Sequence, residues 1–289
     1  MPLWLAATLV AMLIFTVSGL FQKALVMRRP EHPVAIAAMT KLTGTCFIAL
    51  SLPLEPAGLP ADPAPWLLLA LNILVWTCAN ILDIRSFRLT EVSDIYLIRT
   101  LSPALSFCSG IILFGEPFAL TKLAGLVLIL GGLVVLSYRK GSLVFDQGQR
   151  LQLLTTILLP IGVGLDMYLL RHFSLLFYIT VNLGMLPLPM ILLAGSERQR
   201  IGRDFLAMFR RPVLMTEPAF LGFCLAANTL LLMLAMKHGE LSRIMPLMTG
   251  STLLIVAGGW LFLGERDRLA RKLTTTVMGI AGVLLLTLS

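Results

Sequence analysis

Apolar runs of membrane length are the feature that most constrains this chain. Its 289 residues are 57% hydrophobic and 13% charged, with a mean hydropathy of +0.90. Soluble domains carry about 25% charged residues. A bilayer core of about 30 Å needs roughly 20 apolar residues per helix. The sequence therefore predicts an all-α integral membrane protein, with no stretch left over for an independent soluble domain.

Ten apolar runs are separated by charged or helix-breaking residues. In the first half they cover about 3–22, 34–54, 66–87, 92–114 and 119–138. In the second half they cover about 151–170, 173–194, 215–236, 241–263 and 273–288. The first run lacks a basic leader and a cleavage site, so we expect a retained helix. The charged link Arg139–Arg150 separates two predicted units, residues 1–140 and 141–289.

A repeated pattern relates these two units. At an offset of 149 residues, the positions Arg88, Glu91, Ser93, Gly115 and Glu116 recur as Lys237, Glu240, Ser242, Gly264 and Glu265. Five spans per unit is an odd number, so the second copy must enter the membrane from the opposite side. The sequence predicts two inverted five-helix repeats, an arrangement that recurs in secondary transporters with the substrate site between the repeats.

Positive charges predict the orientation. The loops after odd-numbered spans hold 17 of the 23 Lys and Arg residues, and the loops after even-numbered spans hold 4. The positive-inside rule places the odd loops in the cytoplasm, which puts both termini of this cell-membrane protein outside. The basic, partly apolar segment Ser196–Pro212 is expected to lie as a helix at the cytoplasmic interface. The net charge of +8 then favours anionic membrane lipids as partners, and no nucleic acid.

The repeated pattern of Ser, then Pro or a polar residue, then Gly-Glu resembles the drug/metabolite transporter superfamily, in particular its ten-span EamA-like family. The resemblance covers essentially the whole chain and rests on Ser93, Pro103, Glu116, Gly125, Gly131 and Gly132, and on Ala235, Ser242, Gly264, Glu265, Gly279 and Gly282. The chain departs from the pattern at Thr252, where the first copy has Pro, and at Lys41, where relatives often have Arg. The resemblance implies a carrier of small metabolites, as a monomer or homodimer. Relatives are commonly drawn with both termini in the cytoplasm, opposite to the charge count.

Polar residues inside the spans indicate where a substrate would bind. A charge at mid-bilayer costs about 2.5–3.5 kcal/mol on insertion scales, so such residues normally face a cavity or a partner. We expect substrate contacts from Lys41, Trp76, Asn80, Asp83, Tyr96, Arg99, Asp166, Tyr178, Asn182 and Asn228. Asp83 and Arg99 also fit a structural ion pair, and each Asn also fits a hydrogen bond between helices.

The predicted function is a secondary transporter that exports a small polar metabolite, such as an amino acid or a related zwitterion or anion, by alternating access. Asp83 or Asp166 would take a coupling proton or pair with a substrate amine, and Lys41 or Arg99 would hold a carboxylate. The alternative is a flippase for a lipid-linked or amphiphilic headgroup. A purely structural membrane protein would not explain the charges inside the spans.

No enzyme and no cofactor are expected. The sequence contains no nucleophile elbow, no HExxH motif and no phosphate-binding loop. The four cysteines, Cys46, Cys78, Cys108 and Cys224, have no paired or metal-like spacing. Glu116 and Glu265 are expected to cap the start of the helix that follows each of them.

Overall fold

The computed structural model describes residues 3–55, 58–102, 105, 120–139, 142–143, 145–238, 241–265 and 269–287. This part of the chain is almost entirely helical. The exception is a short antiparallel ribbon of β1 (Tyr138–Arg139) and β2 (Ser142–Leu143). The prediction of an all-α membrane fold is therefore confirmed at the level of the fold class.

The helices follow the apolar runs. In the first half they are α1 (Leu3–Arg28), α2 (Pro33–Ala49), the 3₁₀ turn η1 (Leu52–Leu54), α3 (Pro63–Leu89), α4 (Val92–Arg99) and α6 (Leu120–Ser137). In the second half they are α7 (Gln147–Leu169), α8 (Leu175–Met185), α9 (Pro187–Leu192), the 3₁₀ turn η2 (Gly195–Glu197), α10 (Arg198–Arg210), α11 (Pro212–His238), α12 (Leu241–Phe262) and α13 (Leu269–Thr287). Several begin with proline, which has no N–H to leave unpaired in a first helical turn.

Six helical stretches of the described chain are long and apolar enough to cross a membrane: Leu3–Arg28, Pro33–Leu54, Pro63–Leu89, Gln147–Leu169, Leu175–Leu192 and Pro212–Ala235. Leu123–Leu136 and Met248–Phe262 are shorter apolar helices. The predicted span 92–114 is described from Val92 to Ser102 and at Leu105; its other residues lie outside the described chain. The protein is thus a multi-pass membrane protein, and the count of ten spans stays a prediction.

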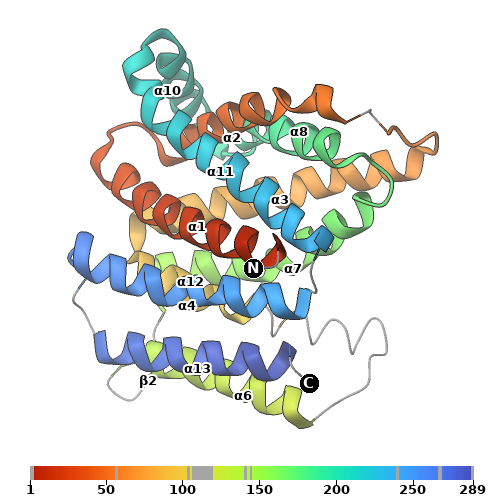
Figure 1. Cartoon of the computed structure of the whole chain (residues 1–289). Coiled ribbons are helices and arrows are strands. Elements are labelled where there is room, and N and C mark those ends of the chain that lie inside the picture. The colour runs from red at the N-terminus through yellow and green to blue at the C-terminus, as the bar shows by residue number, and fades with distance from the viewer. Residues whose placement is uncertain are drawn as a thin grey trace.

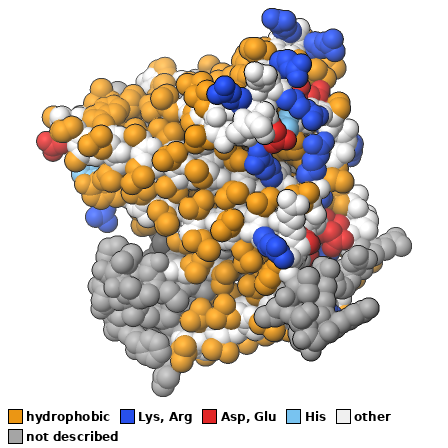
Figure 2. Space-filling model, turned by 180° about the vertical axis from the view of Figure 1, so that it is seen from behind, with side chains coloured by type: hydrophobic (Ala, Val, Ile, Leu, Met, Phe, Trp, Pro, Cys, Tyr) orange, Lys and Arg blue, Asp and Glu red, His pale blue; other side chains and the backbone are white. Residues whose placement is uncertain are grey.

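Two segments of the second half differ in detail from the sequence prediction. The run 173–194 is divided into α8 and α9 at Pro187, because proline cannot donate the hydrogen bond that would continue the helix. The basic segment forms α10, which buries Ile201 and Met208 and leaves its arginines on the outer side. Figure 2 shows apolar side chains over most of the visible face, with Lys and Arg gathered at one end.

Helices from the two halves of the chain interleave. Helix α1 packs on α11 and α12, α2 packs on α11, and α3 packs on α7. Helices α6 and α13 pair at one edge of the molecule (Figure 1). Their backbones meet closely at Gly282, where a Cβ atom would lie 2.6 Å from the carbonyl oxygen of Gly125. Glycine at both positions permits this close contact between the helices.

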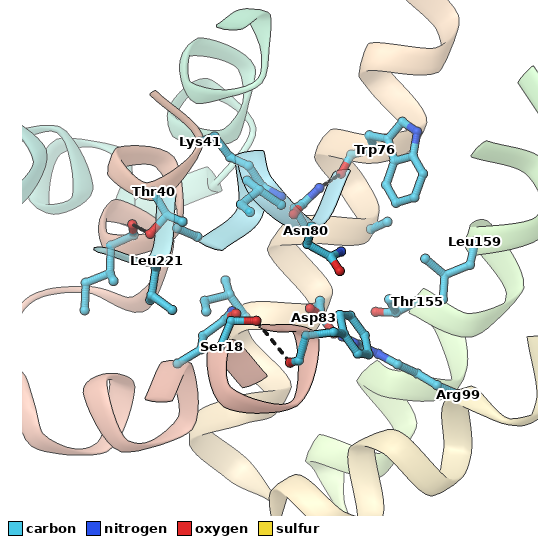
Figure 3. A pocket seen from close by; sticks show the side chains of 18 of the residues that line it. Ser18, Thr40, Lys41, Trp76, Asn80, Asp83, Arg99, Thr155, Leu159 and Leu221 are labelled. Atoms are coloured by element: carbon cyan, nitrogen blue, oxygen red, sulfur yellow. Dashed lines mark hydrogen bonds and ion pairs between the residues drawn. The ribbon is translucent and has the colours of Figure 1, made fainter. Parts of the chain in front are cut away.

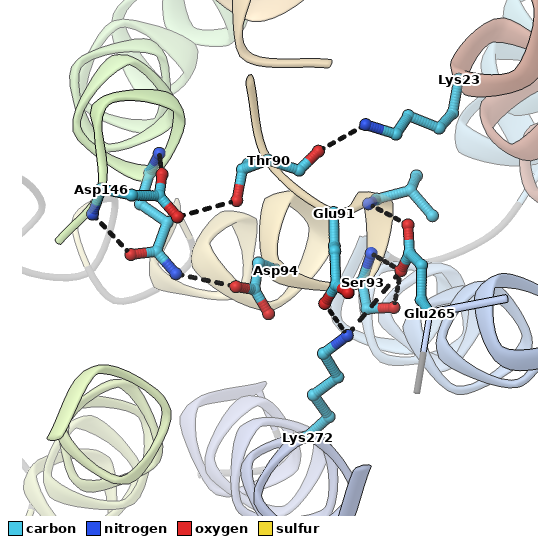
Figure 4. Close-up of polar contacts among 10 residues, drawn as sticks. Lys23, Thr90, Glu91, Ser93, Asp94, Asp146, Glu265 and Lys272 are labelled. Atoms are coloured by element: carbon cyan, nitrogen blue, oxygen red, sulfur yellow. Dashed lines mark hydrogen bonds and ion pairs between the residues drawn. The ribbon is translucent and has the colours of Figure 1, made fainter. Parts of the chain in front are cut away.

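A buried polar layer joins the start of α4 to the second half (Figure 4). The Glu265 carboxylate accepts hydrogen bonds from the backbone N–H groups of Val92 (2.7 Å) and Ser93 (3.1 Å). Lys272 pairs with Glu91, and its ammonium lies 3.8 Å from Glu265. The expected capping by Glu265 is therefore present, but our assignment of the helix was wrong, because Glu265 caps α4 of the first half. Glu116 lies outside the described residues.

Candidate functional site

A cavity of about 340 Å³ lies between helices of both halves (Figure 3). Helices α1, α2, α3 and α4 line it from the first half, and α7 and α11 line it from the second. Helices α6 and α13 contribute none of its described lining residues. The polar lining side chains are Ser18, Gln22, Thr40, Lys41, Asn80, Asp83, Arg99, Thr155 and Asn228.

Three charged side chains face this cavity. Arg99 of α4 pairs with Asp83 of α3, and Gln152 of α7 bridges them. In the amide orientation that satisfies both of its ends, Gln152 donates to Asp83 Oδ1 (3.0 Å) and accepts from Arg99 Nε (3.1 Å). The Lys41 ammonium of α2 has no hydrogen-bond or ion-pair partner among the residues that the structure describes, although the Lys41 backbone carbonyl accepts from Thr45. The cavity therefore carries one net positive charge and one unpaired ammonium.

Aromatic rings form much of the remaining wall. Tyr96 lies under the Arg99 guanidinium, with the Arg99 Cζ atom 4.6 Å from the ring centroid. Phe15 packs edge-on against Tyr96, with the ring centroids 5.4 Å apart. Trp76 forms another part of the wall, and Asn80 donates to the Trp76 backbone carbonyl (2.7 Å). Apolar walls with a few placed polar groups are typical of sites that bind small molecules.

Seven of the ten predicted site residues line the cavity, namely Lys41, Trp76, Asn80, Asp83, Tyr96, Arg99 and Asn228. The other three are absent from its lining. Asp166, Tyr178 and Asn182 instead form a separate cluster with Asn72, and Trp76 belongs to both groups, since it lines the cavity and its indole N–H donates to Asp166.

Some polar residues of these two groups were missed by the sequence analysis. Asn72 is fully buried and lies four residues before Trp76, on the same helical face. Trp76, Asn80 and Asp83 continue this face at spacings of four and three residues, so the same helical spacing could have found Asn72. Gln152 and Thr155 gave no such signal, since only the packing of α7 against α3 and α4 brings Gln152 to the Asp83–Arg99 pair and Thr155 to the cavity.

The described residues contain no group of three or more His, Cys, Asp or Glu side chains that could hold a metal ion. Free thiols at Cys46, Cys78 and Cys224 are separate from one another. The polar groups that meet in the cavity are cations, amides, hydroxyls and one paired carboxylate, which are suited to holding a polar solute.

A polar cavity enclosed by apolar helices agrees with a multi-pass membrane transporter. Residues 2–138 match the model of the EamA-like transporter family. The match is consistent with the drug/metabolite transporter superfamily and covers the first half of the chain, whereas the resemblance was expected over the whole length. A match to this family indicates a transporter rather than an enzyme, acting on a small molecule in a membrane.

Solved structures show that the fold is not confined to the matched half. Over 98% of its length the chain is similar to a protein of known crystal structure, of which 97% is covered, with a TM-score of 0.61 and 19% sequence identity. At this identity the likeness concerns the fold alone. A comparison with curated proteins found no match.

Proposed function

We propose that the protein is a secondary transporter that exports a small polar organic metabolite, an amino acid or a related zwitterion or anion, across the cell membrane. The observation that carries this proposal is the unpaired ammonium of Lys41 in a cavity that also holds the Asp83–Arg99 pair. Lys41 would hold the substrate carboxylate. Asp83, with one oxygen committed to Arg99, would receive a substrate amine.

The dimensions and walls of the cavity support a small solute. Its volume of about 340 Å³ is at the lower end of the range of roughly 300–1,000 Å³ found for small-molecule pockets. The Trp76, Tyr96 and Phe15 rings would cover the apolar part of the substrate. A lipid-linked headgroup needs an opening between the helices for its lipid chain. Residues from six helices surround the cavity, which favours a free metabolite over a lipid-linked one.

The proposed mechanism is alternating access. Ten spans would form two inverted units, residues 1–140 and 141–289, which rock about the cavity. The interleaving of first-half and second-half helices around the cavity supports this, as does the position of the α6–α13 pair at the edge.

The proposed orientation puts the basic end in the cytoplasm. The N and C labels in Figure 1 both lie apart from α10, which is at the top of the view. The Lys and Arg side chains visible in Figure 2 gather at the α10 end. With the positive-inside rule, both termini would lie outside.

Transport in proteoliposomes tests the proposal. Purified protein is reconstituted and offered a panel of radiolabelled zwitterionic, anionic and cationic metabolites, together with a fluorescent phospholipid. We expect carboxylate-bearing metabolites to cross, and Lys41→Ala to abolish their transport. The matched control is Arg171→Ala, which removes a positive charge from an exposed position. Movement of the phospholipid with no metabolite would replace this proposal with a flippase.

A further inference from the structure

Asp166 of α7 has neutral partners in the described chain. Its Oδ1 atom accepts hydrogen bonds from Asn72 Nδ2 (2.6 Å), Trp76 Nε1 (3.1 Å) and Asn182 Nδ2 (3.4 Å), and from the Tyr178 hydroxyl. Asp83, by contrast, is paired with a cation. An ionised carboxylate buried among apolar helices without a cation is costly, and neutral donors offset part of this cost.

The helices around α7 bring no opposite charge to Asp166. From α3, the facing groups are Asn72 and Trp76; from α8, they are Tyr178 and Asn182. Of these four, Tyr178 is the titratable group. Helix α4 also packs against α7, but its charged side chains contact α7 near the opposite end, at Gln149 and Gln152. Protonation would therefore remove a charge that no described cation balances.

The cluster also holds acceptors for that proton. The Oδ1 atoms of Asn72 and Asn182 are buried and have no hydrogen-bond partner in the described chain. Buried polar atoms are normally paired, since each unpaired one costs about 1–3 kcal/mol. If one of these amides turns by half a rotation, it stops donating to the carboxylate and accepts from the protonated carboxyl instead. Asp166 can thus become neutral with no fewer hydrogen bonds to its amide neighbours.

Trp76 connects this cluster to the cavity. Its indole N–H donates to Asp166, and the same side chain lines the cavity. The ring is held from behind by α7, where a Cβ atom at Gly162 would lie 2.9 Å from it. Hydrogen bonds to an ionised acceptor are roughly twice as strong as neutral ones. Protonation of Asp166 would accordingly loosen Trp76 and change the cavity wall.

We propose that Asp166 is the binding site of a coupling proton and that Trp76 communicates its charge state to the substrate cavity. The proton comes from water, binds a carboxylate oxygen and returns to water on release. This inference rests on the proposed function, because a coupling ion has a role only in a transporter. It also selects Asp166 from the two carboxylates that the sequence left open, since Arg99 holds Asp83.

Fluorescence of Trp76 tests the proposal without any substrate. The triple variant Trp4→Phe, Trp66→Phe and Trp260→Phe leaves Trp76 as the sole tryptophan. Its emission is titrated with pH in sodium-free nanodiscs. We expect a single-proton transition, and its loss in the Asp166→Asn background. Infrared difference spectra between the two ends of the transition should contain the band of a protonated carboxyl, which the same substitution removes.

Three further variants separate Asp166 from its neighbours. Tyr178→Phe and Asp83→Asn should both keep a transition, because neither removes the proposed site. Asp166→Glu, which retains a carboxyl should Asp166→Asn fail to fold, should titrate at a different pH.

The proposal is overturned by a transition that persists in Asp166→Asn, by emission that does not respond to pH, or by a response to sodium ions at fixed pH. Since no substrate is present, a failed titration removes the proton site and leaves the proposed transport standing. If transport fails while the titration is intact, the proposed transport is removed and the proton site remains.

Discussion

Gly222 of α11 is a position where the contact between the halves is sensitive to one added carbon. A Cβ atom there would lie 2.6 Å from the backbone nitrogen of Gly44 and 2.9 Å from the carbonyl oxygen of Thr40, both in α2. Ordinary contact begins near 3.4 Å, and a helix backbone cannot rotate away as a side chain can. Gly222→Ala must therefore push α2 and α11 apart.

The expected cost follows from this geometry. Overpacking of a close contact costs about 1–3 kcal/mol, and separating the helices would also break the hydrogen bond from Thr43 Oγ1 to the Pro218 carbonyl (3.2 Å). That bond contributes roughly 1 kcal/mol. We expect a loss of about 2–4 kcal/mol, against which the better helix propensity of alanine returns less than about 1 kcal/mol. Because Thr40 and Lys41 line the cavity on the same turn of α2, transport should fall as well.

The assay is reversible unfolding in mixed micelles, followed by circular dichroism, with Gly164→Ala as the matched control. Gly164 is also in a helix, α7, and a Cβ atom there meets no atom within 4 Å. Gly164→Ala should be neutral or slightly stabilising. If Gly222→Ala unfolds at the same denaturant concentration as Gly164→Ala, the close packing of α2 on α11 is refuted.

Two other predictions concern polar groups near helix ends. Burial lowers the pKa of His32 below its usual 6.5, against the opposing effect of Glu197. The folded state binds this proton less readily than the unfolded state, so this contribution to the stability is fully present above pH 6.5 and is lost as the pH drops below it. Between pH 7.5 and pH 5 the thermal unfolding temperature should therefore decline less in His32→Gln than in the wild type. Lys272→Met leaves the Glu91 and Glu265 carboxylates without their cation, which should cost roughly 3 kcal/mol, the low end for a buried pair, because Glu91 is 30% exposed. Denaturant unfolding measures this loss, and Lys272→Arg should restore part of it.

Much of the fold could be predicted because apolar run length determines helix length in a membrane. The run 3–22 lies within α1. Trp76, Asn80 and Asp83 share one helical face by their spacing, and all three line the cavity. Pro187 also indicates the division between α8 and α9, although the prediction treated 173–194 as one span.

What could not be predicted depends on contacts between distant segments. Glu265 caps α4, which lies more than 170 residues away, and no local pattern names that partner. Asp166 and Tyr178 are polar residues within apolar runs, as the cavity residues are. In the structure they nevertheless form a separate cluster, to which Trp76 donates a hydrogen bond. Polarity inside a span identifies buried polar sites, and helix packing decides which of them share a cavity.

The most direct test of the central claim is a comparison of two substrates in two proteins. A transported amino acid and its amide, in which an uncharged carboxamide replaces the carboxylate, are measured in proteoliposomes of the wild type and of Lys41→Ala. A hydrogen bond to a charged group is worth about 1.5–3 kcal/mol, or roughly a ten- to a hundredfold change in affinity. The account predicts that loss for the amino acid and little change for the amide. Equal effects on both substrates, or none on either, would contradict a carboxylate site at Lys41.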